Sequence, residues 1–139
     1  DECLLKLSAP DELLEMTAER LNLSKRLKAG GYEGFARAEK PRFAPAGKGA
    51  FFSSLERIRM LLYLLELDRD EGGAGLNLDG LIKSEVLSAV VPIHEVAVSE
   101  GRLMEKWCRA PWRWLPDQPL DEIRGYFGER IALYFAFIQ

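Results

Sequence analysis

The sequence feature that most constrains the fold is an aromatic-rich apolar stripe near the carboxyl terminus. Its members recur at offsets of three and four residues, which is the spacing of one face of an α-helix. They are Ile123, Tyr126, Phe127, Ile131, Tyr134, Phe135 and Ile138. Gly125 and Gly128 interrupt the pattern, so Leu120–Ile138 is predicted to form a pair of helices. Burial of seven such side chains would contribute on the order of 10–20 kcal/mol gross, an upper bound.

Basic and tryptophan side chains accompany this stripe. Arg124 and Arg130 flank it, and Trp112 and Trp114 lie just upstream. Tryptophan beside arginine is typical of a membrane–water interface. Each base would add only about 1 kcal/mol against an anionic leaflet, so apolar burial decides where the segment lies. Two interpretations stay open: the stripe lies on a membrane, or it packs on the core of its own domain. The two arginines either contact phosphates or cap and solvate the helices.

Composition limits the class of protein. The chain has 139 residues with 19 basic and 22 acidic side chains, a net charge of −3, which suits one globular domain and argues against a dedicated nucleic-acid binder. Cys3 and Cys108 stand far apart and in no metal-binding spacing, which indicates free thiols in a reducing compartment. No apolar run reaches the roughly 18 residues that a membrane-spanning helix needs.

Periodicity and turn residues predict an α+β fold. Strands are expected over residues 2–8, around Tyr32–Ala38 and over Leu87–Ile93, the last of the edge type because it meets Pro92. Helices are expected from Pro10 to Asn22, from a cap at Ser53 or Ser54 to a glycine-rich break at Asp68–Gly75, over Leu76–Leu87 and over Glu95–Arg109. The helix after Ser54 is apolar on more than one face and is expected to be central and largely covered.

Residues 23–52 form a basic, aromatic segment. Seven lysines and arginines oppose only Glu33 and Glu39, and Tyr32, Phe35, Phe43, Phe51 and Phe52 are interleaved with them. Aromatic rings between cations can stack on single-stranded nucleic acid. The alternative is that the rings anchor a basic loop to the body of the domain, and the sequence favours this second interpretation.

The candidate motifs for catalysis and cofactor binding in this sequence are incomplete. Asp68 and Asp70 fit a calcium loop, but Gly72 stands where an oxygen ligand belongs. Gly47-Lys48-Gly49 lacks the features of a phosphate loop, and His94 is the only histidine. Because nucleophilic catalysis needs a base and an orienting group, we expect no enzyme. No catalytic residue, metal ligand or cofactor is predicted within this sequence.

The carboxyl-terminal residues resemble the anoctamin family. Pro92-Ile-His94-Glu95 is similar to the family's "PLH" followed by Asp or Glu, and Trp107 to a shared tryptophan. The run from Gln118 to Phe137 resembles "QP[IL]D.IR.YFGEKI.LYF.[WF]L" with few departures. Leu4–Asn22 is similar to the family's strand, "AP" turn and helix. The short loops and the "PIHE" form look most like the branch of plant, algal and intracellular-membrane anoctamins.

The resemblance carries expectations about fold and function. It implies that residues 1–117 are a cytosolic amino-terminal domain of the dimerisation type with a partial ferredoxin-like fold. Residues 118–139 would be two short amphipathic helices leading into the membrane region. The parent protein would be a homodimeric, calcium-activated anion channel or phospholipid scramblase. Its calcium ligands would lie on later membrane helices, outside this sequence.

The role expected of this segment is regulation and assembly, without transport or catalysis of its own. We expect the chain to be a piece of a longer protein at the cytoplasmic face of the plasma membrane or endoplasmic reticulum. Its partners would be its own membrane region, a second subunit and lipid. A different class of function stays open: a ferredoxin-like binding module that grips RNA or an acidic protein through residues 23–48.

Overall fold

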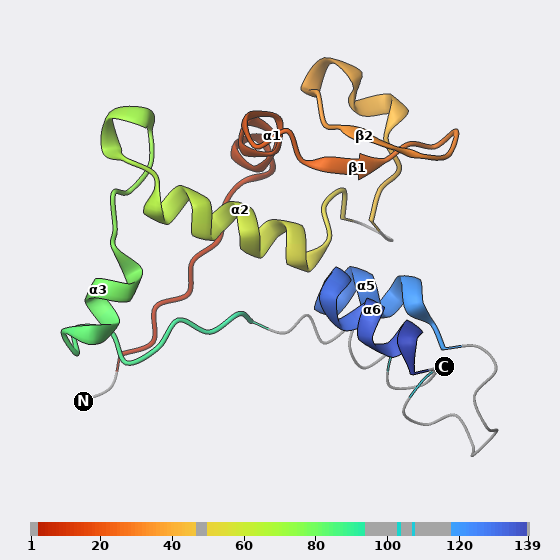
Figure 1. Cartoon of the computed structure of the whole chain (residues 1–139). Helices are drawn as coiled ribbons and strands as arrows, with labels where there is room; N and C mark the ends of the chain where they lie inside the picture. The colour runs from red at the N-terminus through yellow and green to blue at the C-terminus, as the bar shows by residue number, and fades with distance from the viewer. Residues whose placement is uncertain (1–2, 47–49, 94–102, 104–106, 108–117, 139) are drawn as a thin grey trace. The chain divides into compact units, whose positions relative to one another are not determined.

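A computed structural model describes residues 3–46, 50–93, 103, 107 and 118–138 (Figure 1). The chain divides into two units, each with its own internal contacts. Unit 1 comprises residues 1–51 and 57–90, and unit 2 comprises residues 52–56 and 91–139. Helices and a small antiparallel sheet occur together, which confirms the α+β class.

The first helix of unit 1, α1 (Asp11–Arg20), forms where the sequence predicts it. Pro10 occupies the N-cap position and Asp11 and Glu12 lie in the first turn, where carboxylates favour the positive end of the helix dipole. Leu14 and Ala18 are buried, and so is Thr17, whose hydroxyl donates to the Leu13 carbonyl at 2.7 Å. The helix ends at Leu21.

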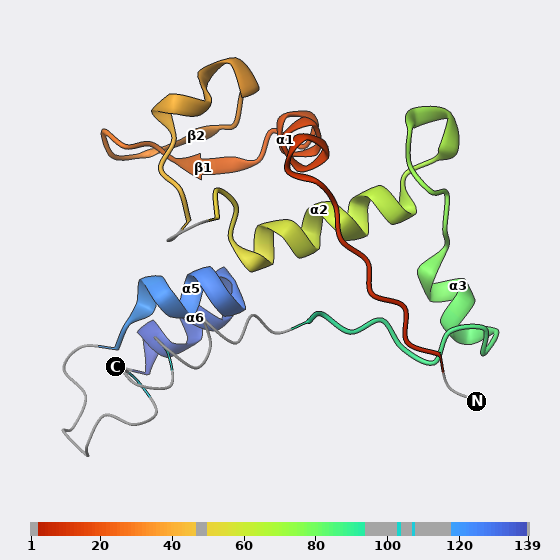
Figure 2. The same cartoon turned by 180° about the vertical axis from the view of Figure 1, so that it is seen from behind.

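A short β-hairpin continues from α1 (Figures 1 and 2). Its strands are β1 (Ser24–Arg26) and β2 (Tyr32–Gly34), paired antiparallel with Lys25 opposite Glu33. Gly30 and Gly31 form the turn with φ of 99° and 85°, a conformation that glycine adopts without strain. Sequence analysis placed a strand at Tyr32–Ala38 but missed β1. The pairing also ends early, because residues 37–42 form the 3-10 helix η1 (Arg37–Arg42).

The longest helix, α2 (Ser54–Glu66), begins with a capping box. The Ser53 N–H donates to Glu56 Oε2 at 2.7 Å, and the Glu56 N–H donates to Ser53 Oγ at 3.2 Å. Only Met60 is fully buried in this helix, and its other apolar side chains are half-buried. The expectation of a largely covered central helix is therefore met only in part.

The chain after α2 folds back on the end of that helix. The predicted glycine-rich break holds a short 3-10 helix, η2 (Arg69–Glu71), and the Ala74 and Leu76 N–H groups donate to the Leu64 and Leu65 carbonyls. Arg20 of α1 reaches this break, donating to the Glu71 carbonyl at 2.8 Å and pairing with its carboxylate. Helix α3 spans only Leu78–Lys83, shorter than the predicted Leu76–Leu87, because Glu85 turns to a φ of 61°.

Two predicted strands are wrong. Residues 3–8 and 87–93 carry no strand, and among the described residues none pairs with them. Leu4 is 96 % exposed, and Val90, Val91 and Ile93 are exposed as well. A strand needs a neighbour to accept and donate its backbone hydrogen bonds, and alternation alone supplies none. The described residues thus hold a two-stranded sheet only, and a ferredoxin-like sheet is not confirmed. The predicted helix Glu95–Arg109 and the tryptophan-rich turn lie outside the described residues, except Leu103 and Trp107.

Candidate functional site

The predicted pair of helices at the carboxyl end of unit 2 is present. Helix α5 (Leu120–Phe127) begins after Pro119, a residue that fits a helix start because the first helical N–H groups lack intrahelical partners. Asp121 and Glu122 lie in its first turn and Arg124 in its last turn, so the charges complement the helix dipole. The helix ends at Gly128, whose N–H donates to the Arg124 carbonyl at 3.0 Å.

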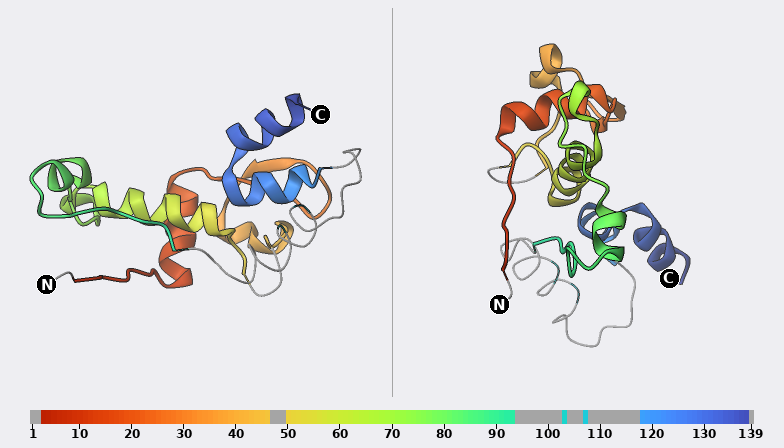
Figure 3. Two further views of the ribbon diagram at one scale, coloured as in Figure 1. Left: turned by 90° about the horizontal axis from the view of Figure 1, so that it is seen from below. Right: turned by 90° about the vertical axis from the view of Figure 1, so that its left-hand side faces the viewer.

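Gly128 reverses the chain into α6 (Glu129–Phe137). Its φ of 93° and ψ of 174° lie in a region of backbone conformation open essentially to glycine alone. Figure 3 shows α5 and α6 diverging from this turn. The sequence predicted breaks near Gly125 and Gly128. Only Gly128 breaks the helix, while Gly125 lies within α5, where a Cβ would meet open space.

One face of the pair forms a small apolar core. Ile123 is fully buried, at 0 % exposure, together with Leu103 and Ala132. Four larger side chains pack against this core: Trp107, Leu120, Tyr126 and Phe135. The rings of Trp107 and Phe135 meet edge to face, with their centroids 4.7 Å apart and an interplanar angle of 89°. This cluster holds the two helices together.

Six apolar side chains of the pair lie outside this core and are exposed, and we call them the outer face. They are Phe127, Ile131, Leu133, Tyr134, Phe137 and Ile138. Phe137 is 90 % exposed. Single exposed apolar residues are ordinary, but six of them on two short helices make this surface a candidate for contact with a partner protein or a membrane.

The stripe predicted from the sequence therefore divides between the two faces. Ile123 lies in the core, Tyr126 and Phe135 pack on it, and Phe127, Ile131, Tyr134 and Ile138 belong to the outer face. Arg124 is half-buried on α5 and Arg130 is exposed on α6. Trp112 and Trp114 lie outside the described residues. The core interpretation is confirmed for Ile123, Tyr126 and Phe135, and membrane contact by the exposed members stays a prediction.

Sequence reasoning missed some members of both faces. Leu103 and Ala132 belong to the core, and Leu133 and Phe137 to the outer face. The signal for the last two was available: Ile131–Ile138 is apolar on every side, and such a helix has more apolar surface than one stripe can bury. The core role of Leu103 depends on tertiary packing and left no local signal.

The basic segment of unit 1 differs from this exposed surface. Phe35 and Phe43 are buried and stack with centroids 5.3 Å apart. Lys40 Nζ lies 2.6 Å from Glu15 Oε1 of α1, and Arg42 pairs with Glu33 and Glu39. These rings anchor the segment, as the sequence favoured, and buried rings cannot stack on nucleic-acid bases. Among the described residues, no three His, Cys, Asp or Glu side chains gather as a metal site.

Comparison with known proteins connects this geometry to a family. The chain is 35 % identical to human Anoctamin-3 over 119 residues, which cover 75 % of this chain. It is 32 % identical to human Anoctamin-8 over 146 residues, covering 95 % of this chain, and 36 % identical to mouse Anoctamin-7 over 104 residues, covering 63 %. No family model matches the chain.

The chain is homologous to the anoctamins. It spans about 12 % of the length of these anoctamin relatives, so it corresponds to one segment of such a protein. In the described part of the chain, no helix has both the length and the apolar character needed to cross a bilayer.

Proposed function

We propose that this chain is the cytosolic amino-terminal part of an anoctamin-like dimeric membrane protein. That protein would act as a calcium-activated anion channel, a phospholipid scramblase, or both. In this proposal the chain positions the membrane region, contacts the second subunit and transmits regulation, and it performs no transport or catalysis itself. The supporting observation is the outer face of α5 and α6 in a chain homologous to anoctamins.

The outer face is proposed to lie against the cytoplasmic surface of the plasma membrane or endoplasmic reticulum. Its exposed side chains would each gain about 1.5–3 kcal/mol on full burial, so the six together would gain on the order of 10 kcal/mol gross. Arg124 and Arg130 would add about 1 kcal/mol each beside anionic lipid. The apolar face would thus fix the depth of the helices, and the arginines would tune the preference for lipid charge.

The finer features of the proposal rest on sequence resemblance. Residues 1–117 would be the dimerisation-type domain, and residues 118–139 the start of the membrane region. Residues 1–117 would belong to a partial ferredoxin-like domain. Calcium would bind in the membrane region of the whole protein. The Pro92–Glu95 sequence supports placement near the plant, algal and intracellular-membrane branch.

Vesicle flotation tests the membrane contact. The 139-residue chain is mixed with vesicles of phosphatidylglycerol and phosphatidylcholine, and the floating fraction is measured for the wild type and for Phe137→Asp. We expect the substitution to lower the partition constant by about tenfold or more, because it removes a fully exposed ring and adds a charge to the apolar face.

The matched control is Leu4→Asp, which alters an equally exposed apolar side chain in unit 1. It should leave flotation unchanged. An equal loss of flotation in both variants would mean that general hydrophobicity drives binding. A wild-type chain that does not float with the vesicles would contradict membrane contact by the outer face.

A further inference from the structure

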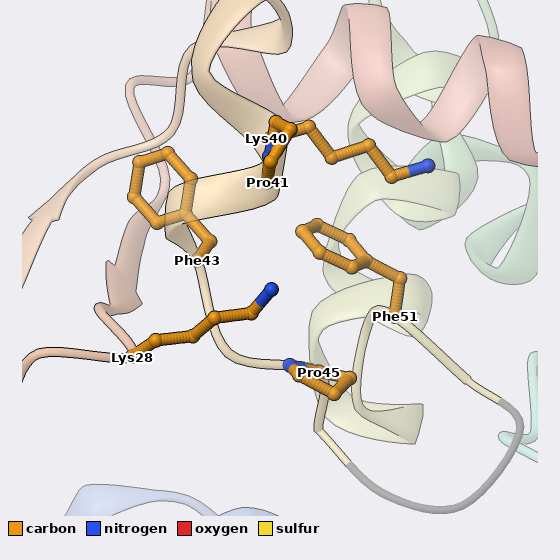
Figure 4. Close-up of a pocket in the computed structure, with 6 residues that line it drawn as sticks. All are labelled: Lys28, Lys40, Pro41, Phe43, Pro45 and Phe51. Carbon is orange, nitrogen blue, oxygen red and sulfur yellow. The ribbon is translucent and has the colours of Figure 1, made fainter.

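A small hollow in unit 1 brings apolar walls and positive charge together (Figure 4). It is a shallow, open depression of about 340 Å³, and it is lined by Lys28, Lys40, Pro41, Phe43, Pro45 and Phe51. Two phenylalanine rings and two prolines supply its walls, drawn from η1 and from the chain on either side of it. A volume of this size is near the lower end of the range of small-molecule sites, about 300–1,000 Å³.

The ammonium group of Lys28 enters this hollow. Figure 4 shows the side chain extending between Phe43 and Pro45 toward the Phe51 ring. Its backbone is fixed, because the Lys28 N–H donates to the Arg42 carbonyl at 2.9 Å and Leu27 bridges to Phe43. Among the described residues, no carboxylate forms an ion pair with this ammonium group. Lys28 is an exposed residue, so the site presents a solvent-accessible ammonium group, with no carboxylate partner in the described part of the chain, beside an apolar wall.

Two other cations near the hollow, unlike Lys28, form ion pairs with carboxylates. Arg42 pairs with two carboxylates and Lys40 with Glu15. On the Phe51 ring, Lys25 Nζ and Lys40 Nζ lie 4.8 Å and 5.0 Å from the centroid, and Lys25 is only 3 % exposed. Two lysines thus lie over one aromatic ring, and Lys40 is also paired with Glu15. The Lys28 ammonium group adds a positive charge beside the apolar walls, and an anion paired with it there would gain more than it would in bulk water.

We propose that this hollow binds a small amphiphilic anion, with an apolar chain or ring against Phe43 and Phe51 and a carboxylate or phosphate on the Lys28 ammonium group. Charge complementarity selects the anion, and the apolar walls select a ligand with a hydrocarbon body. The size of the hollow favours a free small molecule over a lipid held in a bilayer. This inference is independent of the proposed function, because it involves neither α5 nor α6.

Nuclear magnetic resonance titration of the ¹⁵N-labelled 139-residue chain tests the inference. Sodium decanoate below its micelle concentration is the probe. Decyltrimethylammonium and inorganic phosphate are the matched probes, one with the chain and the opposite charge, the other with the charge and no chain. Decanoate should shift the amide signals of Lys28, Phe43 and Phe51 in a saturable manner, and the two matched probes should not.

Substitutions at Lys28 test whether its ammonium group binds the anion. Lys28→Met should raise the dissociation constant for decanoate about tenfold, because it removes the charge-assisted contact, and Lys28→Arg should restore binding within about threefold. Arg26→Met, which removes an exposed cation two residues away and outside the hollow, should bind as the wild type does. A wild-type-like spectrum for each variant confirms that the fold is intact.

Several results would overturn the inference. They are unchanged affinity in Lys28→Met, equal binding of decyltrimethylammonium, equal binding of phosphate alone, and shifts confined to α5 and α6. Binding of phosphatidylglycerol vesicles that is lost in Lys28→Met, with no response to free decanoate, would assign the site to a lipid headgroup and likewise contradict the proposal as stated.

Discussion

The basic segment of unit 1 and the helix pair of unit 2 have similar compositions and opposite arrangements. Both interleave aromatic rings with cations. In unit 1, Phe35 and Phe43 are buried, and carboxylates of α1 and β2 pair with Lys40 and Arg42. In unit 2, Tyr134 and Phe137 point outward. Aromatic–basic composition therefore does not determine a binding surface, because adjacent acidic residues decide whether the cations need any partner outside the chain.

The largest expected effect tests whether the rings of unit 1 are truly internal. Phe43→Ala should lower the free energy of unfolding by about 3–5 kcal/mol, because it leaves a cavity in a closely packed site. Tyr32→Ala, at an exposed ring in the same segment, should change it by about 0.5 kcal/mol or less. Urea denaturation followed by circular dichroism measures both. Similar losses at the two positions would remove the distinction between anchoring and exposed rings.

The next effect compares the two faces of unit 2. Ile123→Ala should cost about 2–4 kcal/mol and loosen the helix pair, because Ile123 is the fully buried centre of its core. Leu133→Ala on the outer face should stay within about 0.5 kcal/mol in the absence of lipid. Amide hydrogen exchange across residues 118–138 reports the loss locally. Strong destabilisation by Leu133→Ala would mean that protein, and not another apolar phase, already covers the outer face.

The smallest effect concerns the neutralisation of the basic segment. Glu15→Gln should lower the free energy of unfolding by about 1 kcal/mol at low salt, because this carboxylate is only 16 % exposed and contacts Lys40 and Arg37. Glu12→Gln, whose carboxylate is 81 % exposed, should have no measurable effect. In 1 M NaCl, the loss in free energy of unfolding caused by Glu15→Gln should be smaller, because salt screens the ion pairs. A loss that is insensitive to salt would assign the role of Glu15 to packing.

Local signals were sufficient to predict several of the helix ends. Pro10 with its following acids, the Ser53–Glu56 box and Gly128 each act within one turn of the chain, so their effects can be predicted without the rest of the fold. The strands could not be predicted this way. Lys25 and its neighbours lack the β-branched residues that mark a strand, yet hairpin closure at Gly30-Gly31 pairs them. Leu4 and Val91 have the pattern of a strand but no partner.

The candidate site on α5 and α6 could likewise be predicted only in part. Spacing identified the stripe, but its division between core and outer face depends on Leu103 and Trp107, which lie far from α5 in the sequence. The charge count of residues 23–52 was correct, but part of the positive charge pairs with Glu15, which lies outside that segment. Both differences arise from contacts between distant residues, which periodicity does not report.

The conformation of Gly128 has a geometrical consequence. With any other residue at that position, the eighteen residues from Leu120 to Phe137 would tend to continue as one rod of about 27 Å, close to the width of a bilayer interior but carrying five ionised groups. Such a rod would be too polar to cross a bilayer. A single hydrogen atom in place of a side chain at position 128 thus divides one long helix into two short helices that fold together on a shared apolar core.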